Sequence, residues 1–424
     1  MIFTFDAPIT GGTVQAIPSK SMAHRLLICA SFADAPTAVV CPLTSEDIDA
    51  TARVLSSLGT KITKTVDGFF IEPIRHIQKG AVLDCGESGS TLRFMLPIAA
   101  ALGAEARFIR HGRLKERPLS PLYEELIRHG AILPNDPTVD PLTLGGKIKA
   151  GDFTLRADVS SQFVSGLLLA MPLLGEASTL TLTGTVESKE YIHVTETAMA
   201  RFGAAPLVSK EGRFYKAGAV NYTSPGSVTV EGDWSNAALW LAFGAIGKTP
   251  VTVTGLDINS PQGDKRIYEI LSDFGAGVAV SENAVTVSPA PLSGIRMDAS
   301  QIPDLVPALS AVAAAASGET VLTGIRRLRL KESDRAAAVC KMLTSLGADV
   351  TEEEDALVIH GGRKLSGGKV SSHRDHRMVM CAALLSAIAE NTVSVTDAEA
   401  IGKSYPTFKK DYRALGGILT ETKE

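Results

Sequence analysis

The sequence is poor in aromatic residues and in cysteine, and it lacks long apolar runs. Aromatic residues make up 5% of the 424 residues, against 45% hydrophobic and 21% charged residues, so the chain is not disordered, collagen-like or a coiled coil. No uninterrupted apolar stretch reaches the roughly 18 residues that a membrane span needs. The first residues, MIFTFDAPIT, lack the basic segment and apolar stretch of a secretory signal. We therefore expect a globular protein that does not act at a membrane.

The five cysteines fit neither a disulfide framework nor a zinc site. Their number is odd, and none of them stands in a CxxC or CxxxH arrangement. We expect reduced thiols, a cytoplasmic location and no metal. The net charge of −4, from 42 basic and 46 acidic side chains, argues against nonspecific nucleic-acid binding. Any anion site must therefore be a local concentration of positive charge.

An internal repeat occupies the whole chain. Six segments in which a helix ends in glycine before a short strand recur about every 70 residues. Each glycine suits the left-handed conformation at a helix C-terminus, because it lacks a Cβ atom. Upstream of each glycine lie a β-rich run and, before that run, an apolar helix, so the repeat is predicted to be βαβαββ. The six glycines are Gly59, Gly130, Gly203, Gly275, Gly347 and Gly416.

The chain ends predict how the repeats are grouped. The sixth repeat lacks its final strand, whereas the chain begins with an unpartnered strand, so residues 1 to about 14 should complete the sixth repeat. A break near Ser224-Pro225-Gly226 then divides three repeats from three. The predicted fold is therefore α/β, with α+β repeats in two lobes of three βαβαββ units around buried central helices. We expect lobes at 15–225 and at 1–14 plus 226–424, with the active site in a cleft between them and a hinge at the two crossings.

Polar residues collect in two sets of loops. One set lies at the N-termini of the buried helices, where unpaired N–H groups and the helix dipole favour phosphates and carboxylates. The other set follows the β-rich runs. We expect these loops to form a positively charged site for anionic small molecules. Their basic residues are Lys20, Arg25, Arg93, Arg117, Lys331, Arg335, Arg374, Arg377 and Lys403.

Ordinary structural roles compete with this interpretation. Asp233 and Ser235 fit the N-cap of a helix, and Asp304 fits a cap as well as a catalyst. The segment 331–335, KESDR, also fits a solvated helix start with salt bridges. Lys20 is harder to explain in this way, because a lysine in the first turn opposes the helix dipole.

Nine short motifs resemble, in order and spacing, those of the 5-enolpyruvylshikimate-3-phosphate synthase family of enolpyruvyl transferases. They span nearly the whole chain and read PSKS with a following HR, GESGSTLRF, LKERP, SSQF, ESKEYI, IPD, RLKESDR, DHRM and KSYP. The resemblance implies transfer of an enolpyruvyl group from phosphoenolpyruvate to the 5-hydroxyl of shikimate 3-phosphate, with release of phosphate from a tetrahedral intermediate. It implies no cofactor, and we expect a monomer.

The resemblance also implies roles for individual residues. Asp304 is the implied proton acceptor, while Glu332, His376 and Lys403 remain alternative proton donors and Lys20 is a further catalytic residue. The implied shikimate 3-phosphate contacts are Lys20, Ser21, Arg25, Ser160, Ser161, Gln162, Ser188, Tyr191, Asp304 and Lys331. The implied phosphoenolpyruvate contacts are Lys20, Gly89, Arg117, Gln162, Glu332, Arg335, Arg377 and Lys403.

Two positions depart from the family pattern. Glu87 adds a negative charge where members often carry Asn, and Arg327 stands where many members carry a neutral amide. The nearest alternative function is the transfer of enolpyruvyl to UDP-N-acetylglucosamine. That family carries a Lys-Asn pair and a mobile-loop Cys, whereas this chain reads Lys20-Ser21 and RLKERP. A catalytically inactive or regulatory member is a third interpretation, which the presence of all the implied acid and base residues disfavours.

Overall fold

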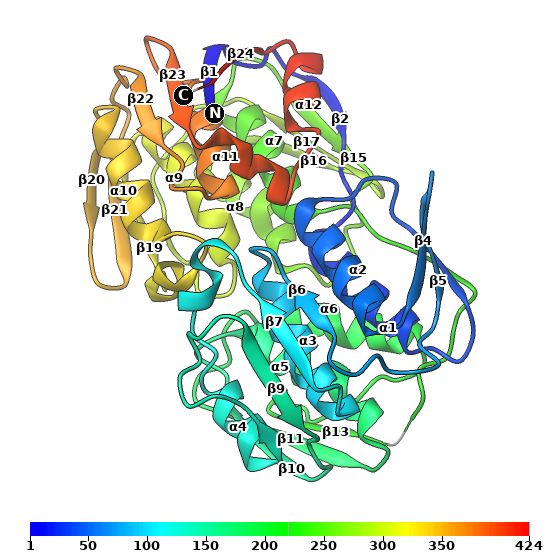
Figure 1. Ribbon diagram of the computed structural model, residues 1–424. Coiled ribbons are helices and arrows are strands. Elements are labelled where there is room, and N and C mark those ends of the chain that lie inside the picture. Colours follow the sequence, from blue (N-terminus) through cyan, green and yellow to red (C-terminus); the bar gives the residue numbers. More distant parts are fainter. Residues whose placement is uncertain (219, 424) are drawn as a thin grey trace. The chain divides into compact units, whose positions relative to one another are not determined.

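The computed structural model describes residues 1–218 and 220–423, which divide by their contacts into two units (Figure 1). The continuous unit is Pro18–Val230, and the split unit combines Met1–Ile17 with Glu231–Glu424. Ala219 and Glu424, which the expected lobes include, lie outside the described residues. Within the described part of the chain, no helix is both long and apolar enough to cross a membrane.

Three buried helices form the centre of the continuous unit. They are α1 (Lys20–Ser31), α3 (Gly89–Leu102) and α5 (Ser161–Ala170). α3 and α5 approach closely, since a Cβ atom on Gly166 would come within 2.2 Å of the Arg93 carbonyl oxygen. The amphipathic helices α2 (Glu46–Leu58), α4 (Leu122–Arg128) and α6 (Lys189–Arg201) belong to the same repeats. Two 3-10 turns, η1 (Gly112–Glu116) and η2 (Met171–Leu174), complete the helical elements.

Each repeat contributes one four-stranded sheet, and all six sheets share one strand order. The sheets of the continuous unit are β14 (Ser227–Thr229), β3 (Thr37–Val40), β5 (Gly68–Glu72), β4 (Lys61–Thr65); β6 (Val82–Asp84), β7 (Ala106–Ile109), β9 (Leu142–Gly146), β8 (Ala131–Ile132); and β10 (Asp152–Arg156), β11 (Ser178–Thr183), β13 (Phe214–Ala217), β12 (Leu207–Val208). In each sheet the first two strands are parallel, and the third strand is antiparallel to both of its neighbours, as in β6, β7, β9 and β8. In four of the sheets the buried helix joins the two parallel strands, whereas the sheets that contain β2 (Gly12–Gln15) and β14 pair strands from distant parts of the chain.

The split unit repeats this design around α7 (Trp234–Ile246), α9 (Val306–Ala315) and α11 (His376–Leu385), which pack against one another (Figure 1). Its amphipathic helices are α8 (Ile267–Phe274), α10 (Arg335–Ser345) and α12 (Phe408–Ala414). Four 3-10 turns lie at the helix starts and strand ends, namely η3 (Gly263–Arg266), η4 (Pro303–Leu305), η5 (Arg326–Leu330) and η6 (Ala398–Lys403).

The three sheets of the split unit draw on both ends of the chain. They are β2 (Gly12–Gln15), β15 (Val251–Thr254), β17 (Ala284–Ser288), β16 (Gly277–Val280); β18 (Arg296–Asp298), β19 (Gly318–Thr323), β21 (Ala356–Gly361), β20 (Asp349–Glu352); and β22 (Gly368–Ser371), β23 (Val393–Thr396), β1 (Ile2–Ala7), β24 (Ile418–Thr422). β1 lies between β23 and β24, with Phe3 opposite Val395 and Glu421. The prediction that the first strand completes the sixth repeat is therefore confirmed.

Strand exchange at the two crossings sets the bounds of the units. β2 pairs in parallel with β15 of the fourth repeat, while β14 pairs in parallel with β3 of the first repeat. The contacts therefore change unit after Ile17 and after Val230, a few residues beyond the expected 14 and 225. The six repeat glycines all adopt positive φ, from 69° to 117°, as their predicted position at helix C-termini requires.

Candidate active site

Side-chain caps begin five of the six buried helices, and α9 is the exception. Asp233 caps α7 by accepting a hydrogen bond from the backbone of Asn236 at 2.7 Å, as its sequence position suggested. Asp304 lies within η4, directly before α9, and is the N-cap residue of neither element, since these positions are held by Ile302 and Leu305. Asp304 therefore does not stand at the N-cap position that its sequence suggested, and its carboxylate binds two cations instead. The other caps are Ser19, Ser88, Ser160 and Asp375.

Asp304 belongs to a cluster of charged side chains in the split unit. Its Oδ1 accepts hydrogen bonds from Lys331 Nζ at 3.1 Å and from Arg335 Nη1 at 2.7 Å. Burial raises the pKa of Asp304, but Lys331, Arg335 and Arg377 outweigh burial and hold that pKa well below its usual range. The carboxylate is therefore ionised at neutral pH, as a proton acceptor must be.

Arg335 is the centre of this cluster, because it binds three carboxylates. Besides Asp304, its Nε donates to Asp375 at 2.8 Å and its Nη2 donates to Glu332 at 2.7 Å. The Arg335 side chain is only 2% exposed, so residues 331–335 are not a solvated helix start. Asp375 is fully buried, whereas the side chains of Asp304 and Glu332 are each 20% exposed. An incoming anion can therefore replace an outer carboxylate while Asp375 keeps the guanidinium in place.

Two further cations lie next to Asp375. The backbone N–H of Arg377 donates to Asp375 Oδ1 at 2.9 Å, and Arg377 Nη1 donates to the Ser235 carbonyl at 2.6 Å. Lys403, at the end of η6, donates from Nζ to the Arg374 carbonyl at 2.9 Å. The fifth and sixth repeats thus bring the expected phosphoenolpyruvate contacts of this unit to one region, and the fourth repeat holds Arg377 through the Ser235 carbonyl.

The three candidate proton donors differ in their surroundings. Glu332 is paired with Arg335 and is 20% exposed. His376 is buried, with Nδ1 3.8 Å from Asp375 Oδ1, and Lys403 is 8% exposed. Glu332 is therefore the most accessible of the three side chains.

In the continuous unit, Lys20 has a carboxylate partner that sequence reasoning missed. Lys20 Nζ donates to Asp47 Oδ2 at 2.8 Å, and the two side chains are 18% and 13% exposed. Asp47 lies in the first turn of α2, after the cap Ser45, where an acidic residue has an ordinary role near the helix dipole. That role concealed Asp47 in the sequence, just as the capping role of Asp375 concealed its contact with Arg335.

Arg25 is held by its own unit through four hydrogen bonds. Its donors reach Thr195 Oγ1 at 2.7 Å, Ser165 Oγ at 3.2 Å, and the carbonyls of Ser21 and Tyr191 at 2.6 and 3.0 Å. Burial lowers the pKa of Arg25 to about 9. These contacts join α1, α5 and α6, so Arg25 has a structural role beside any contact with substrate.

Gln162 is fixed at the start of α5 by neighbours from another repeat. Arg93 Nη1 donates to Gln162 Oε1 at 2.6 Å, and Gln162 Nε2 donates to Ser90 Oγ at 2.9 Å. Its backbone N–H donates to Ser160 Oγ at 3.3 Å, and Ser161 is the first residue of the helix. Arg93, to which the resemblance gave no contact, thus orients a residue that we expect to meet both substrates.

The start of α3 leaves room for an arginine only because its first residue is glycine. A Cβ atom on Gly89 would lie 2.7 Å from Arg117 Nη1. Glu87 lies against the turn that leads to Arg117, since a Cβ atom on Gly112 would come within 2.6 Å of the Glu87 carboxylate. The additional negative charge of this chain is therefore beside η1.

Ser188 and Tyr191 form the start of α6. Ser188 is buried and adopts the left-handed conformation, with φ of 53°, and its carbonyl accepts a hydrogen bond from the Tyr191 backbone at 3.1 Å. The Tyr191 carbonyl in turn holds Arg25. The two expected contacts are thus connected to the Arg25 network.

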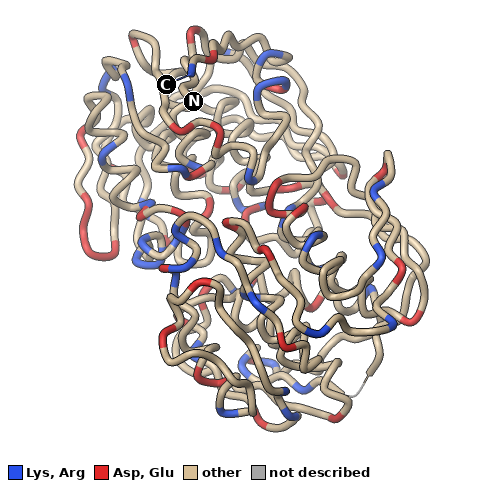
Figure 2. Tube along the Cα trace, viewed as in Figure 1, with Lys and Arg blue, Asp and Glu red and all other residues tan. Residues whose placement is uncertain are grey.

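The expected concentration of positive charge is partly neutralised within each unit. Lys20 faces Asp47, and Lys331 and Arg335 face carboxylates of their own cluster. Figure 2 shows acidic and basic residues interspersed along both units, with neither sign prevailing. Anionic ligands must therefore compete with carboxylates for these cations.

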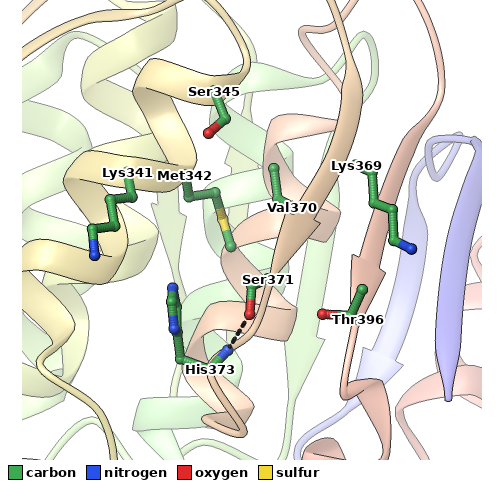
Figure 3. Close-up of a pocket in the computed structure, with 8 residues that line it drawn as sticks. All are labelled: Lys341, Met342, Ser345, Lys369, Val370, Ser371, His373 and Thr396. Carbon is green, nitrogen blue, oxygen red and sulfur yellow. Dashed lines mark hydrogen bonds between the residues drawn. The ribbon is translucent and has the colours of Figure 1, made fainter.

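A cavity of about 370 Å³ opens elsewhere in the split unit (Figure 3). Figure 3 shows the side chains of Lys341 and Lys369 pointing in opposite directions, so positive charge does not converge there. None of the expected substrate contacts lines this cavity, which is formed by Lys341, Met342, Ser345, Lys369, Val370, Ser371, His373 and Thr396.

Comparisons with known proteins agree with this arrangement. The family model described as EPSP synthase (3-phosphoshikimate 1-carboxyvinyltransferase) matches residues 7–412. A 3-phosphoshikimate 1-carboxyvinyltransferase from Clostridium kluyveri is 42% identical over 97% of this chain and 96% of its own length. An EPSP synthase structure from Acinetobacter baumannii, 23% identical, covers 100% of both chains with a TM-score of 0.81. The enolpyruvyl transferase NikO from Streptomyces tendae, 16% identical, covers 99% of this chain and 98% of its own with a TM-score of 0.80. The predicted fold class is confirmed.

Proposed function

The chain belongs to the EPSP synthase family and transfers the enolpyruvyl group of phosphoenolpyruvate to shikimate 3-phosphate, and we propose that the cluster around Arg335 and Asp304 takes part directly in this reaction. The reaction is a step of aromatic amino acid biosynthesis. The observation that carries the proposal is a buried arginine bound to three carboxylates, two of which are partly exposed. Such an arginine can accept an anionic substrate without leaving its position.

Proton transfer is the first requirement of the chemistry. Asp304 accepts the proton of the 5-hydroxyl of shikimate 3-phosphate, and the hydroxyl oxygen bonds to the central carbon of phosphoenolpyruvate. Glu332, His376 or Lys403 supplies a proton to the terminal carbon of phosphoenolpyruvate. The product of this addition is a tetrahedral ketal phosphate. Its phosphate then leaves with the C–O bonding electrons, and loss of a proton from the terminal carbon restores the enol double bond.

Anion recognition is the second requirement, since each substrate carries a phosphate and a carboxylate. Guanidinium groups bind both anions through paired N–H donors, and serine hydroxyls near helix N-termini add neutral donors. We assign to phosphoenolpyruvate Lys20, Gly89, Arg117, Gln162, Glu332, Arg335, Arg377 and Lys403. We assign to shikimate 3-phosphate Lys20, Ser21, Arg25, Ser160, Ser161, Gln162, Ser188, Tyr191, Asp304 and Lys331.

The assigned contacts come from both units, so we propose that the units move together around the substrates. The two chain crossings, after Ile17 and after Val230, supply a hinge for this movement. Small-angle X-ray scattering should show a smaller radius of gyration when both substrates are bound. An unchanged radius at saturating substrate would contradict closure.

We also propose a cytoplasmic enzyme that acts as a monomer. All five cysteines are free, which suits a reducing compartment. The proposed mechanism uses residues of one chain and assigns no role to a second copy. Sedimentation equilibrium that finds a stable dimer would contradict the monomer.

A phosphate-release assay tests the proposed function. The enzyme should release phosphate from phosphoenolpyruvate when shikimate 3-phosphate is the acceptor, and UDP-N-acetylglucosamine should give no release. Release with the UDP-sugar alone would show that the alternative acceptor is correct, and release with neither would indicate an inactive member.

A further inference from the structure

The loop of the fourth repeat carries a buried acid to which the sequence analysis gave no role. This loop follows β15 and continues into η3, at the place where other repeats carry their basic loops. Its Asp264, within η3, is 2% exposed. A carboxylate at this depth requires an explanation, because an ionised group loses its hydration when it is buried.

Asp264 reaches the cluster through Ser235. The Ser235 hydroxyl donates a hydrogen bond to Asp264 Oδ2, and the Ser235 carbonyl accepts one from Arg377 Nη1 at 2.6 Å. Ser235 stands in the first turn of α7, directly after the cap Asp233 and its neighbour Trp234. Asp264 therefore fixes the residue that orients the Arg377 guanidinium.

Several charges act on Asp264 from the elements packed around it. Burial and the charge of Asp304 raise the pKa of Asp264 to about 6, and Asp233 adds to this effect. The Ser235 hydroxyl and Arg377 act in the opposite direction. On η3 itself, Lys265 is occupied with the Ile258 carbonyl at 3.2 Å. Asp264 thus gains or loses its charge near pH 6 within reach of Asp304 and Arg377.

We propose that Asp264 is a positioning residue for phosphoenolpyruvate binding, which holds Ser235 and through it sets the orientation of Arg377. The inference rests on the proposed roles of Arg377 and Asp304. Its consequence is that phosphoenolpyruvate binds less tightly when Asp264 takes up a proton, because a neutral carboxyl holds the Ser235 hydroxyl less strongly than a carboxylate does and Arg377 loses its fixed orientation. Binding of shikimate 3-phosphate, which is not assigned to Arg377, changes little.

The variant Asp264→Asn tests the proposal, with Asp273→Asn as the matched control. Asp273 is an exposed aspartate of the same unit. At pH 7.5 we expect the KM for phosphoenolpyruvate to rise about tenfold in Asp264→Asn and the KM for shikimate 3-phosphate to change less than about twofold. The rise of the phosphoenolpyruvate KM below about pH 6 in the unaltered enzyme should also disappear. An Asp264→Asn enzyme whose phosphoenolpyruvate KM and pH profile match those of the control would overturn the proposal.

Ser235→Ala gives an independent test, because it removes the hydroxyl and keeps both the carboxylate and the Ser235 carbonyl. Loss of this hydrogen bond should move the acid-side transition to higher pH, and an unmoved transition would contradict the proposal. Arg377→Lys separates the two levels of inference. If it leaves the phosphoenolpyruvate KM unchanged, the assignment of Arg377 fails. If it raises that KM while Asp264→Asn has no effect, only the role of Asp264 fails.

Discussion

Asp304 is subject to two opposing demands. A general base must be ionised, and Lys331 and Arg335 ensure this by binding its carboxylate at 3.1 and 2.7 Å. The same cations make the carboxylate a weak base, because they stabilise its charge. We infer that the anionic substrates draw one cation away when they bind, so that Asp304 becomes more basic next to the substrate hydroxyl.

Replacing this carboxylate tests its role. Asp304→Asn keeps the size of the side chain but cannot take up the hydroxyl proton, so kcat should fall by about 10²–10⁴-fold. Phosphate release measures the effect, and circular dichroism checks that the fold is retained. Asp273→Asn should keep normal turnover. Full activity in Asp304→Asn would remove Asp304 from the mechanism.

Asp264 leads to a prediction about stability at different pH values. Its pKa rises from 3.8 to about 6 on folding, so the folded chain holds this proton more tightly than the unfolded chain does. Its contribution to stability is therefore complete below about pH 4 and is lost as the pH rises through 6. Asp264→Asn avoids this loss and should increase the free energy of unfolding at pH 7.5 by on the order of 2–3 kcal/mol. Urea titrations at pH 7.5 and pH 4 should show the gain only at the higher pH, and an equal change at both values would refute the explanation.

At the scale of the element, the helix starts combine capping with function. The hydroxyl of Ser88 accepts a hydrogen bond from the backbone of Thr91, which closes the first turn of α3, while Gly89 leaves its outer side open for Arg117. The cap gives the helix its start, and the glycine gives Arg117 its position. A substitution that adds one methyl group should therefore change function more than stability.

Gly89→Ala is that substitution. Its methyl group would lie 2.7 Å from Arg117 Nη1 and 3.2 Å from Arg93 Nη1, so Arg117 must shift. We expect the KM for phosphoenolpyruvate to rise at least about tenfold, with a small change in the melting temperature. Gly145→Ala is the control, because its Cβ atom would make ordinary contact at 3.6 Å. If both variants had the same KM, Gly89 would not be needed for the placement of Arg117.

The elements also show what the sequence can predict. Local patterns of about 10 to 20 residues predict the positive φ of Gly59 and the other repeat glycines. They also predict the burial of helices such as α7. The contacts of Asp47 and Asp264 do not, because each joins side chains that lie more than 25 residues apart in the sequence. Neither residue stands in a local pattern that predicts such a contact, so the sequence carried no signal for it.

At the scale of the whole molecule, the chain forms two structural units, and only the split unit needs the first residues of the chain to complete its sheets. Residues 18–230 contain every strand of three sheets, including β14, which lies beyond the expected end at 225. The split unit takes β1 and β2 from the first residues, so two of its three sheets are incomplete in 231–424 alone. A local reading of the sequence misplaced β14, because its three residues pair with a strand nearly 190 positions earlier.

This difference predicts how fragments of the chain behave. A fragment 18–230 should fold by itself and unfold cooperatively in urea, whereas 231–424 should fold only when a peptide of residues 1–17 is supplied. A fragment 18–225 lacks β14 and with it the largely buried Val228 and Val230. It should be less stable than 18–230 by about 2–4 kcal/mol, from the loss of two buried valines and a strand partner for β3. Equal urea midpoints for the two fragments would show that β14 adds nothing to the continuous unit. Cooperative folding of 231–424 without the peptide would show that the split unit does not depend on the start of the chain.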